Sequence, residues 1–204
     1  MSATAAALSA EAGSYFDPRF KTQALKILPG EYRVDDRDVM LVTVLGSCVA
    51  ACLYDPLRRV GGMNHFMLPE AQDESSTWGT TNSTRYGAFA MEMLINDLLK
   101  RGASKARLQA KLFGGGAVLP GLTTTNVGDQ NAVFALHYMA AEHIPVIGQD
   151  LGDVCPRRVH YFPASGRVMV KRLPAAHTRS VADEERQYRQ SLQQQPKTGS
   201  VELF

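Results

Sequence analysis

Apolar residues are dense between Leu28 and Leu173 and sparse on either side of that stretch. The first residues are rich in alanine and serine, and the chain becomes polar after Pro174. A chain of 204 residues with one dense apolar stretch has the size of a single domain. We therefore expect a flexible extension over 1–20, one folded domain over 21–173, and a disordered tail over 174–204 with room for a short helix around 183–192.

Within the dense stretch, short apolar or alternating runs predict strands, and apolar residues at helical spacing predict two helices. The predicted strands are 39–45, 49–54, 62–68, 107–113, 144–149, 158–162 and 167–172. The predicted helices are 86–101, which ends at a glycine after two basic residues, and 131–143. A polar stretch over 69–85, which contains Trp78, predicts a long loop that either binds a ligand or is a surface insertion.

The runs 49–54 and 62–68 can form a hairpin through 55–60, because Asp-Pro is a favourable start for a turn. Cys48 directly precedes the first strand, and His65 lies in the second. If paired residue numbers add up to 113, these two residues lie opposite each other, about 5 Å apart between Cβ atoms. If the numbers add up to 111 or 115, the two are diagonal neighbours, and any even total puts them on opposite faces. The hypothesis therefore requires an even number of loop residues.

A cysteine and a histidine on one face of a hairpin suggest nucleophilic catalysis, because the imidazole can accept the thiol proton and increase the thiolate fraction. The alternative is that Cys48 is a small buried core residue. Ser47 does not lie in a Gly-x-Ser-x-Gly motif, so a serine hydrolase is not indicated.

Two other kinds of site receive less support. The glycines at 114–116 are not followed by the Lys-Ser/Thr of a phosphate-binding loop, so they more plausibly let the backbone pass close to the catalytic cleft. Cys48 and Cys52 share a strand face but would lie about 13 Å apart at ~3.3 Å per residue, too far to share a metal or a disulfide. We expect no metal and no cofactor.

Charge and composition exclude several classes of partner. The net charge of +2 comes from 22 basic and 20 acidic residues, a balance that supports neither nucleic-acid binding nor an acidic membrane surface. The longest apolar run, 40–54, is too short to span a bilayer, so we expect no insertion into a membrane. Three cysteines cannot form a complete set of disulfides, and no Lys or Arg precedes Arg19 in the manner of a signal peptide. These features predict a cytoplasmic protein with reduced thiols.

The residues around Cys48 and His65 resemble the active-site segment of the CheD family of chemoreceptor glutamine deamidases. The resemblance rests first on residues 43–56, TVLGSCVAACLYDP, and 61–69, GGMNHFMLP. It continues at Tyr86, at 110–115 (AKLFGG), at 128–131 (GDQN), and at 150–152 (DLG) with the arginines at 157 and 158. Family members often have a second glycine where this chain has Asp153.

The resemblance implies an α/β (α+β) fold in which mixed β-sheets pack as a sandwich flanked by helices, as in bacterial toxin deamidases. It implies that Cys48 is the nucleophile, His65 the base, and Thr43 the residue that orients the histidine. We expect Gly46, Ser47, Gly114 and Gly115 to shape the site and its oxyanion hole. Tyr86 and Asn64 are the residues expected to bind the substrate.

The reaction that the resemblance implies is hydrolysis of glutamine side chains on chemoreceptors to glutamate through a thioester, and a CheC-type phosphatase is a further partner that some relatives bind. Two alternatives remain open from the residues themselves. The same pair of side chains would serve another cysteine hydrolase or acyl-transfer enzyme, and the fold would also serve a non-enzymatic adaptor that binds receptors or a phosphatase.

Overall fold

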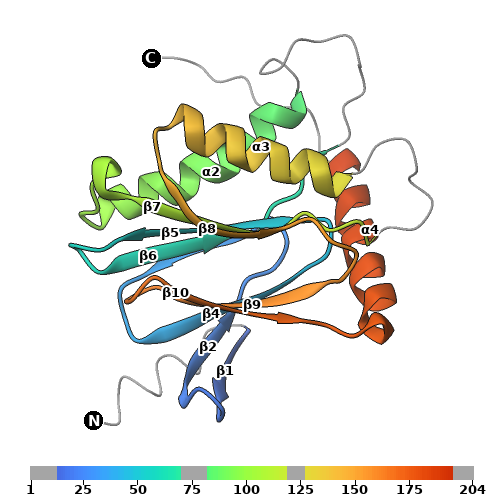
Figure 1. Cartoon of the computed structure of the whole chain (residues 1–204), viewed down its shortest axis with the longest axis horizontal. Coiled ribbons are helices and arrows are strands. Elements are labelled where there is room, and N and C mark those ends of the chain that lie inside the picture. The colour runs from blue at the N-terminus through green and yellow to red at the C-terminus, as the bar shows by residue number, and fades with distance from the viewer. Residues whose placement is uncertain (1–12, 70–81, 119–126, 195–204) are drawn as a thin grey trace.

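A computed structural model describes residues 13–69, 82–118 and 127–194, and they form two five-stranded sheets with three α-helices (Figure 1). The first sheet has the order β1-β2-β4-β9-β10, and the second has the order β3-β6-β5-β7-β8. In each sheet one neighbouring pair is parallel, β2 with β4 and β7 with β8, while the other neighbouring pairs are antiparallel. Both sheets are therefore mixed.

The bounds of the elements follow the chain. The strands of the first sheet are β1 (Ser14–Asp17), β2 (Thr22–Lys26), β4 (Val39–Leu45), β9 (Arg157–Phe162) and β10 (Arg167–Arg172). Those of the second sheet are β3 (Tyr32–Asp35), β5 (Val49–Asp55), β6 (Val60–Asn64), β7 (Gln109–Gly114) and β8 (Val146–Leu151). The α-helices are α2 (Asn82–Lys100), α3 (Val127–Ala141) and α4 (Thr178–Gln194), and short 3-10 turns cover Lys105–Arg107 and Ala175–His177.

The two sheets pack face to face, and α2 and α3 cover the outer face of the second sheet (Figure 1). One apolar cluster lies between that sheet and the helices, and a second cluster, which includes Cys48, lies between the sheets. Strand β5 contributes to both clusters because its alternate side chains point to opposite faces. It is buried on both sides, which explains why its sequence is continuously apolar instead of alternating.

The expected fold class, a sandwich of mixed sheets flanked by helices, is confirmed. The predicted strands and helices all exist; 39–45 and 167–172 coincide with β4 and β10, and the others have shifted ends. Both helices begin four residues earlier than predicted, so residues 82–85 of the expected loop belong to α2. Trp78 and residues 70–81 of that loop lie outside the described residues.

Both predicted chain extensions need correction where the structure describes them. Ser14–Asp17 forms strand β1, which pairs with β2 at the edge of the first sheet, so the ordered fold begins before residue 20. In the expected disordered tail, the short helix expected around 183–192 exists but is longer, because α4 spans 17 residues. Its apolar residues are few, but Val181, Ala182 and Leu192 are buried together on one face.

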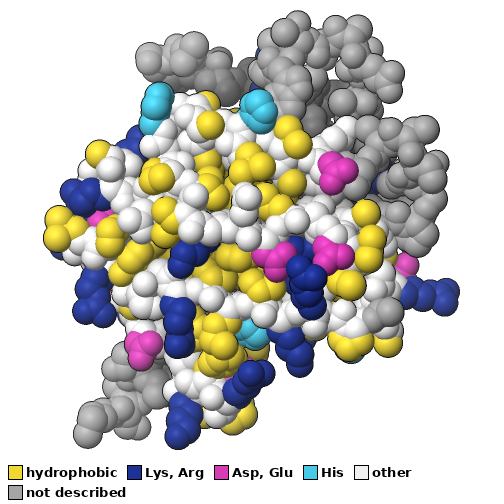
Figure 2. Space-filling model, viewed as in Figure 1, with side chains coloured by type: hydrophobic (Ala, Val, Ile, Leu, Met, Phe, Trp, Pro, Cys, Tyr) yellow, Lys and Arg dark blue, Asp and Glu magenta, His cyan; other side chains and the backbone are white. Residues whose placement is uncertain are grey.

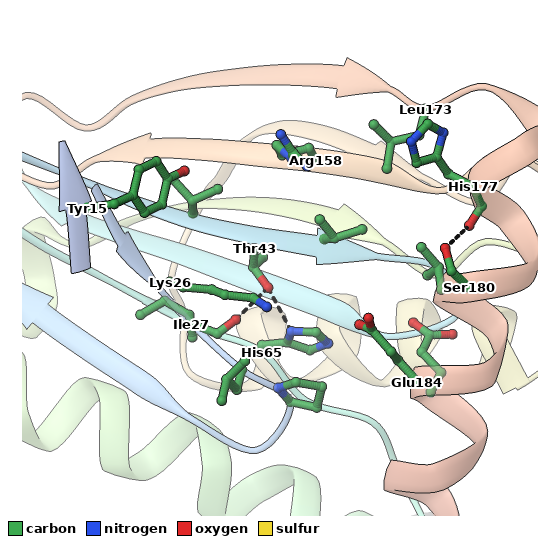
Figure 3. Close-up of a pocket in the computed structure, with 16 residues that line it drawn as sticks. Tyr15, Lys26, Ile27, Thr43, His65, Arg158, Leu173, His177, Ser180 and Glu184 are labelled. Atoms are coloured by element: carbon green, nitrogen blue, oxygen red, sulfur yellow. Dashed lines mark hydrogen bonds between the residues drawn. The ribbon is translucent and has the colours of Figure 1, made fainter. Parts of the chain in front are cut away.

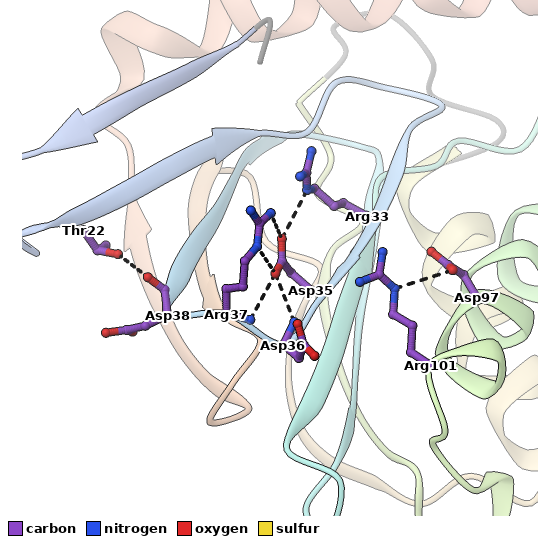
Figure 4. Close-up of polar contacts among 8 residues, drawn as sticks. All are labelled: Thr22, Arg33, Asp35, Asp36, Arg37, Asp38, Asp97 and Arg101. Carbon is purple, nitrogen blue, oxygen red and sulfur yellow. Dashed lines mark hydrogen bonds and ion pairs between the residues drawn. The ribbon is translucent and has the colours of Figure 1, made fainter. Parts of the chain in front are cut away.

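Buried carboxylates anchor connections far from Cys48. Asp35, at the end of β3, accepts hydrogen bonds from the backbone and guanidinium of Arg37 and forms an ion pair with Arg33 (Figure 4). Burial on its own raises the pKa of Asp35, but the bonds from Arg37 outweigh it and hold that pKa below its usual value. The carboxylate therefore stays charged and holds the turn between β3 and β4.

The surface seen in Figure 2 carries charges of both signs. Lys and Arg side chains lie over the first sheet, in the lower part of the view, among apolar and uncharged residues. None of the three helices described is long and apolar enough to cross a membrane.

Candidate active site

Cys48 lies in the short connection between β4 and β5, where several backbone contacts fix its position. The carbonyl of Cys48 accepts a hydrogen bond from Gly115 N (2.8 Å), and that of Gly46 accepts one from Gly116 N (2.7 Å). The Asn131 amide donates to the carbonyl of Ser47 (2.8 Å). The thiol is fully buried in this state. The connection is thus held on both sides, which limits movement of the sulfur.

The register of the hairpin brings His65 to the same face as Cys48. Cys52 pairs with Met63 and Val49 with Phe66, so paired residue numbers add up to 115. This total is one of the diagonal registers predicted from the sequence. The turn between β5 and β6 has four residues, 56–59, which is the even number that the hypothesis requires.

Thr43 orients the imidazole of His65 from strand β4 of the other sheet. Its hydroxyl lies 2.8 Å from His65 Nδ1 and 2.8 Å from the carbonyl oxygen of Ile27 (Figure 3). A hydroxyl has one proton, and a carbonyl can only accept, so Thr43 donates to Ile27 and accepts from Nδ1–H. This arrangement leaves the lone pair of His65 on Nε2, the nitrogen that a general base would use. Nε2 is buried and has no hydrogen-bond partner among the described residues.

The third polar side chain of the site, Glu185, comes from α4. Its carboxylate accepts hydrogen bonds from the backbone N–H groups of Gly46 (2.8 Å), Ser47 (2.8 Å) and Cys48 (3.1 Å). The Ser47 hydroxyl donates to it as well (2.7 Å). Potential ligand atoms of Cys48, His65 and Glu185 lie within 4.8 Å of one another. Three consecutive N–H groups therefore converge on one anionic group beside the thiol.

The electrostatic state of this site is neutral at the thiol and the imidazole. Burial raises the pKa of Cys48 well above its usual value, and the charge of Glu185 raises it further. Burial lowers the pKa of His65 to about 4, although the charge of Glu185 opposes that shift. With Glu185 in place, the pair is therefore held as thiol and neutral imidazole.

Glycines give the backbone and Glu185 the room that this arrangement needs. A Cβ atom at Gly46 would lie 2.8 Å from Glu185 Oε2, and one at Gly114 would lie 2.1 Å from the carbonyl oxygen of Cys48. Gly114 and Gly115 also have positive φ angles, 107° and 66°, which glycine adopts readily. The predicted role of these glycines in shaping the site agrees with their contacts, while a catalytic effect remains to be tested.

Cys48, His65 and Glu185 bring three potential metal-ligand atoms together, so the partners of their lone pairs decide whether an ion fits. A carboxylate offers about four lone-pair positions, and four donors occupy those of Glu185. An ion would have to displace these hydrogen bonds. The donor set therefore fits a bound oxyanion better than a metal.

The two residues predicted to bind substrate lie in different surroundings. The Asn64 amide is buried under α2, where it accepts from Ala51 N (2.9 Å) and donates to the carbonyl of Ala90 (3.3 Å). These bonds join β6 to β5 and α2 and give Asn64 a structural role, while substrate binding by Asn64 stays a prediction. Tyr86, by contrast, forms a hydroxyl–hydroxyl hydrogen bond of 2.6 Å with Tyr188 of α4.

Sequence reasoning missed two residues of the site, Asn131 and Glu185. Asn131 was seen only as the start of a helix, yet its side chain joins the carbonyl of Ser47 to the N–H of Leu68 (2.8 Å). Glu185 falls within the short helix expected around 183–192, but nothing in that polar segment indicates a contact with residues 46–48. The apolar residues around it at helical spacing were the only available hint.

A cavity of about 360 Å³ opens beside Thr43, His65 and Glu185 (Figure 3). Its walls come from the first sheet, from the segment after β2, and from the start of α4. His65 points toward α4 across this space. The cavity therefore leads to the imidazole from the side of the first sheet.

Comparison with known proteins gives matches to a family model, to sequence relatives and to solved structures. The family model described as CheD chemotactic sensory transduction matches residues 67–172. A protein of Xanthomonas campestris pv. campestris named "Probable chemoreceptor glutamine deamidase CheD" is 54% identical over 93% of each chain. A protein of Methylobacillus flagellatus with the same name is 49% identical over 93% of this chain and 94% of its own. Among solved structures, the Bacillus licheniformis hypothetical protein YfiH covers 59% of this chain and 50% of its own, with 14% identity and a TM-score of 0.39.

Proposed function

This chain belongs to the CheD family, and from that premise we propose that it hydrolyses glutamine side chains of chemoreceptors to glutamate. The observation that carries the proposal is the convergence of three N–H groups beside a thiol that faces an oriented imidazole. Acyl transfer through a cysteine requires a nucleophile, a base and an oxyanion hole. The site supplies a candidate for each.

Cys48 is the proposed nucleophile and His65 the proposed base. In the first step His65 Nε2 takes the thiol proton, and the sulfur attacks the amide carbon of the substrate glutamine. Thr43 is a positioning residue, because its hydroxyl holds Nδ1–H and so keeps the lone pair on Nε2. A hydroxyl carries no charge, so it stabilises an imidazolium less than a carboxylate would.

The N–H groups of Gly46, Ser47 and Cys48 are the proposed oxyanion hole. They now hold a carboxylate at 2.8–3.1 Å, which is the distance range expected for an oxyanion. When the tetrahedral intermediate collapses, His65 returns its proton to the leaving nitrogen and ammonia departs. Water, activated by the same imidazole, then hydrolyses the thioester and releases glutamate.

The proposed substrate and partners follow from the relatives' names and the family. Each turnover would add one negative charge to a receptor, which can shift a signalling equilibrium. We place the reaction in the cytoplasm, on the helical signalling part of the receptor. Binding of a CheC-type phosphatase is a further part of the proposal, and a nucleic acid is no part of it.

Mass spectrometry of receptors co-expressed with this protein tests the proposal. The native chain should convert specific glutamines to glutamates, while the Cys48→Ala and His65→Ala variants should leave them unchanged. Cleavage of the receptor backbone would instead indicate a peptidase. Unchanged receptors with the native chain, together with receptor binding, would indicate an adaptor, and full activity of Cys48→Ala would exclude the thiol mechanism.

A further inference from the structure

We propose that helix α4 is a built-in inhibitor of this site, in which the Glu185 side chain occupies the position of the glutamate that the reaction produces. The surface under α4 is then the surface that receives the substrate, and α4 must leave before a receptor glutamine enters. This inference rests on the proposed deamidase function and concerns its regulation.

The chemical identity of the occupant is the first argument. Deamidation of glutamine leaves a glutamate side chain with its carboxylate in the oxyanion hole. Glu185 is a glutamate side chain, it is almost fully buried, and its carboxylate accepts from Gly46 N, Ser47 N and Cys48 N. Its length and its terminal group are therefore those of the product. While it remains bound, no other oxyanion can reach these donors.

A catalytic role for Glu185 fits the contacts less well. The position from which a carboxylate orients a catalytic histidine is the Nδ1 side of the ring, and Thr43 already occupies it. The two oxygens of Glu185 instead accept hydrogen bonds from the donors that a tetrahedral intermediate would need. A residue cannot assist a reaction while it fills the binding site of the intermediate.

The remaining contacts of α4 show that the helix packs on the domain through a few residues of one face. Val181, Ala182, Glu185 and Leu192 are buried on one face. On the same face Tyr188 bonds to Tyr86, and a Cβ atom at Gly30 would lie 2.7 Å from the Tyr188 hydroxyl. In Figure 1, α4 stands beside one end of the two sheets, apart from the layer formed by α2 and α3.

The outer face of α4 suits a helix that can also exist in water. Exposed polar residues cover that face, and Asp183 and Arg186 form an ion pair within the helix (2.8 Å). Release of α4 would expose a few apolar side chains and would free the three N–H donors for substrate. A receptor side chain that offers an oxyanion to the same donors would replace the hydrogen bonds that Glu185 gives up.

Alkylation of Cys48 tests whether α4 covers the site, without any assumption about the substrate. Iodoacetamide should modify Cys48 about tenfold faster in Glu185→Ala than in the native chain, if α4 is docked in roughly nine molecules of ten. Asp183→Ala removes a carboxylate from the exposed face of the same helix and should leave the rate unchanged. Peptide mass spectrometry separates Cys48 from Cys52 and Cys155, and Cys155 reports any general loosening.

A second variant, Glu185→Gln, tests whether the side chain lies where the substrate lies. The amide introduced at position 185 and one water should give glutamate and ammonia, so the peptide that contains this position should gain the mass difference between an amide and an acid. Gln187 on the same helix is an internal control that should not change. The double variant Cys48→Ala with Glu185→Gln should keep its amide.

The outcomes separate this inference from the proposed function. Faster alkylation of Cys48, or conversion of the amide in Glu185→Gln, with no change in any receptor, would retain the inhibitor and reject the receptor substrate. Receptor deamidation by the native chain, with equal alkylation of Cys48 in the native chain and Glu185→Ala and an unconverted amide in Glu185→Gln, would overturn the inference and retain the function. Absence of faster alkylation, of amide conversion and of receptor deamidation would reject both. Thermal melting shows whether Glu185→Ala and Glu185→Gln are folded. If only one of them folds, the result for that variant decides the test.

Discussion

The two ends of strand β5 each hold a buried carboxylate, and the two are held in different ways. At the end of the strand, Asp55 is bound by the guanidinium of Arg107 (2.7 Å) and by the N–H groups of Leu57 and Ser104. At its beginning, the Glu185 carboxylate is bound by four neutral donors of residues 46–48. Asp55 belongs to the turn that it stabilises, whereas Glu185 arrives from a helix more than 130 positions away.

The different partners of Asp55 and Glu185 distinguish a structural carboxylate from one that occupies a binding site. A carboxylate that pairs with arginine and ties together neighbouring loops cannot leave without a high cost. Glu185 is held only by N–H and O–H groups and comes from a helix at the edge of the fold. Another oxyanion can therefore replace its carboxylate and accept the same hydrogen bonds. Burial is the same in both cases, and the partners decide the role.

Replacement of each carboxylate by alanine gives the largest expected contrast. Asp55→Ala leaves several donors without a partner and should lower the free energy of unfolding by roughly 3–4 kcal/mol. Glu185→Ala should cost less, because water can reach the freed donors once α4 has left. Urea denaturation of both variants measures the difference, and equal losses of stability would contradict the distinction.

Acid stability should also separate the two ends of β5. Burial lowers the pKa of His65 to about 4 from an ordinary 6.5, so the unfolded chain binds the proton first as the pH falls. Stability is therefore complete above pH 6.5 and should decrease by roughly 3 kcal/mol as the pH falls to 4. Burial on its own would raise the pKa of Asp55, but the hydrogen bonds from Arg107 outweigh it and hold that pKa well below 3.8. The stability that Asp55 contributes should therefore be lost only when the pH falls below 3.8.

Unfolding at a series of pH values in the native chain and in His65→Asn measures this effect. The variant should lack the slope between pH 6.5 and 4 and keep the loss at lower pH. The same slope in both proteins would show that His65 is not the responsible group.

Thr43→Val removes the hydroxyl that orients the base but keeps the shape of the side chain. We expect turnover to fall about 30-fold, equivalent to roughly 2 kcal/mol, because Nδ1–H loses its acceptor and the lone pair is no longer fixed on Nε2. The loss should appear in kcat with little change in KM, and Thr43→Ser should restore most of the activity. A change in KM alone would assign Thr43 to substrate binding.

Tyr188→Phe gives the smallest effect, because it removes one hydroxyl contact of α4. Loss of the bond to Tyr86 should favour release of α4 by about 1 kcal/mol and so raise the alkylation rate of Cys48 up to fivefold. Glu185 remains in this variant, so its effect should be smaller than that of Glu185→Ala. A larger effect would show that the tyrosine pair, and not the carboxylate, holds α4 in place.

The part of the site that rests on local pattern could be predicted from the sequence. The side-chain period of strands restricts a hairpin to a few registers, and the observed one joins Cys48 and His65 as diagonal neighbours. The positions of Thr43 and of the glycines at 114–115 came from resemblance to a family. Their contacts agree with the expected roles, although their effect on the reaction remains a prediction.

The part that rests on long-range contact could not be predicted. Strands β2 and β3 have five and four residues, too few for a clear alternation, and β2 is defined by its parallel pairing with β4. Helix α4 has the composition of a solvated segment, and its packing depends on Glu185 meeting donors that carry no side-chain signature. Asn64 is the neighbour of His65 in sequence, but its side chain bonds to Ala51 N and to the carbonyl of Ala90, contacts that the local pattern does not reveal.

The segment between β2 and β3 touches both the base and the inhibitor. The carbonyl of Ile27 fixes Thr43, the peptide of His65 is bonded to Gly30 N (2.8 Å) and to the carbonyl of Glu31 (2.9 Å), and Gly30 lies under Tyr188. When α4 departs, solvent gains access to this wall and to the ring that it supports. Burial lowers the pKa of His65 and the charge of Glu185 opposes that shift, so departure of α4 removes both influences on the imidazole together. Exchange of α4 for a receptor would then change the access to the sulfur and the surroundings of its proton acceptor in the same event.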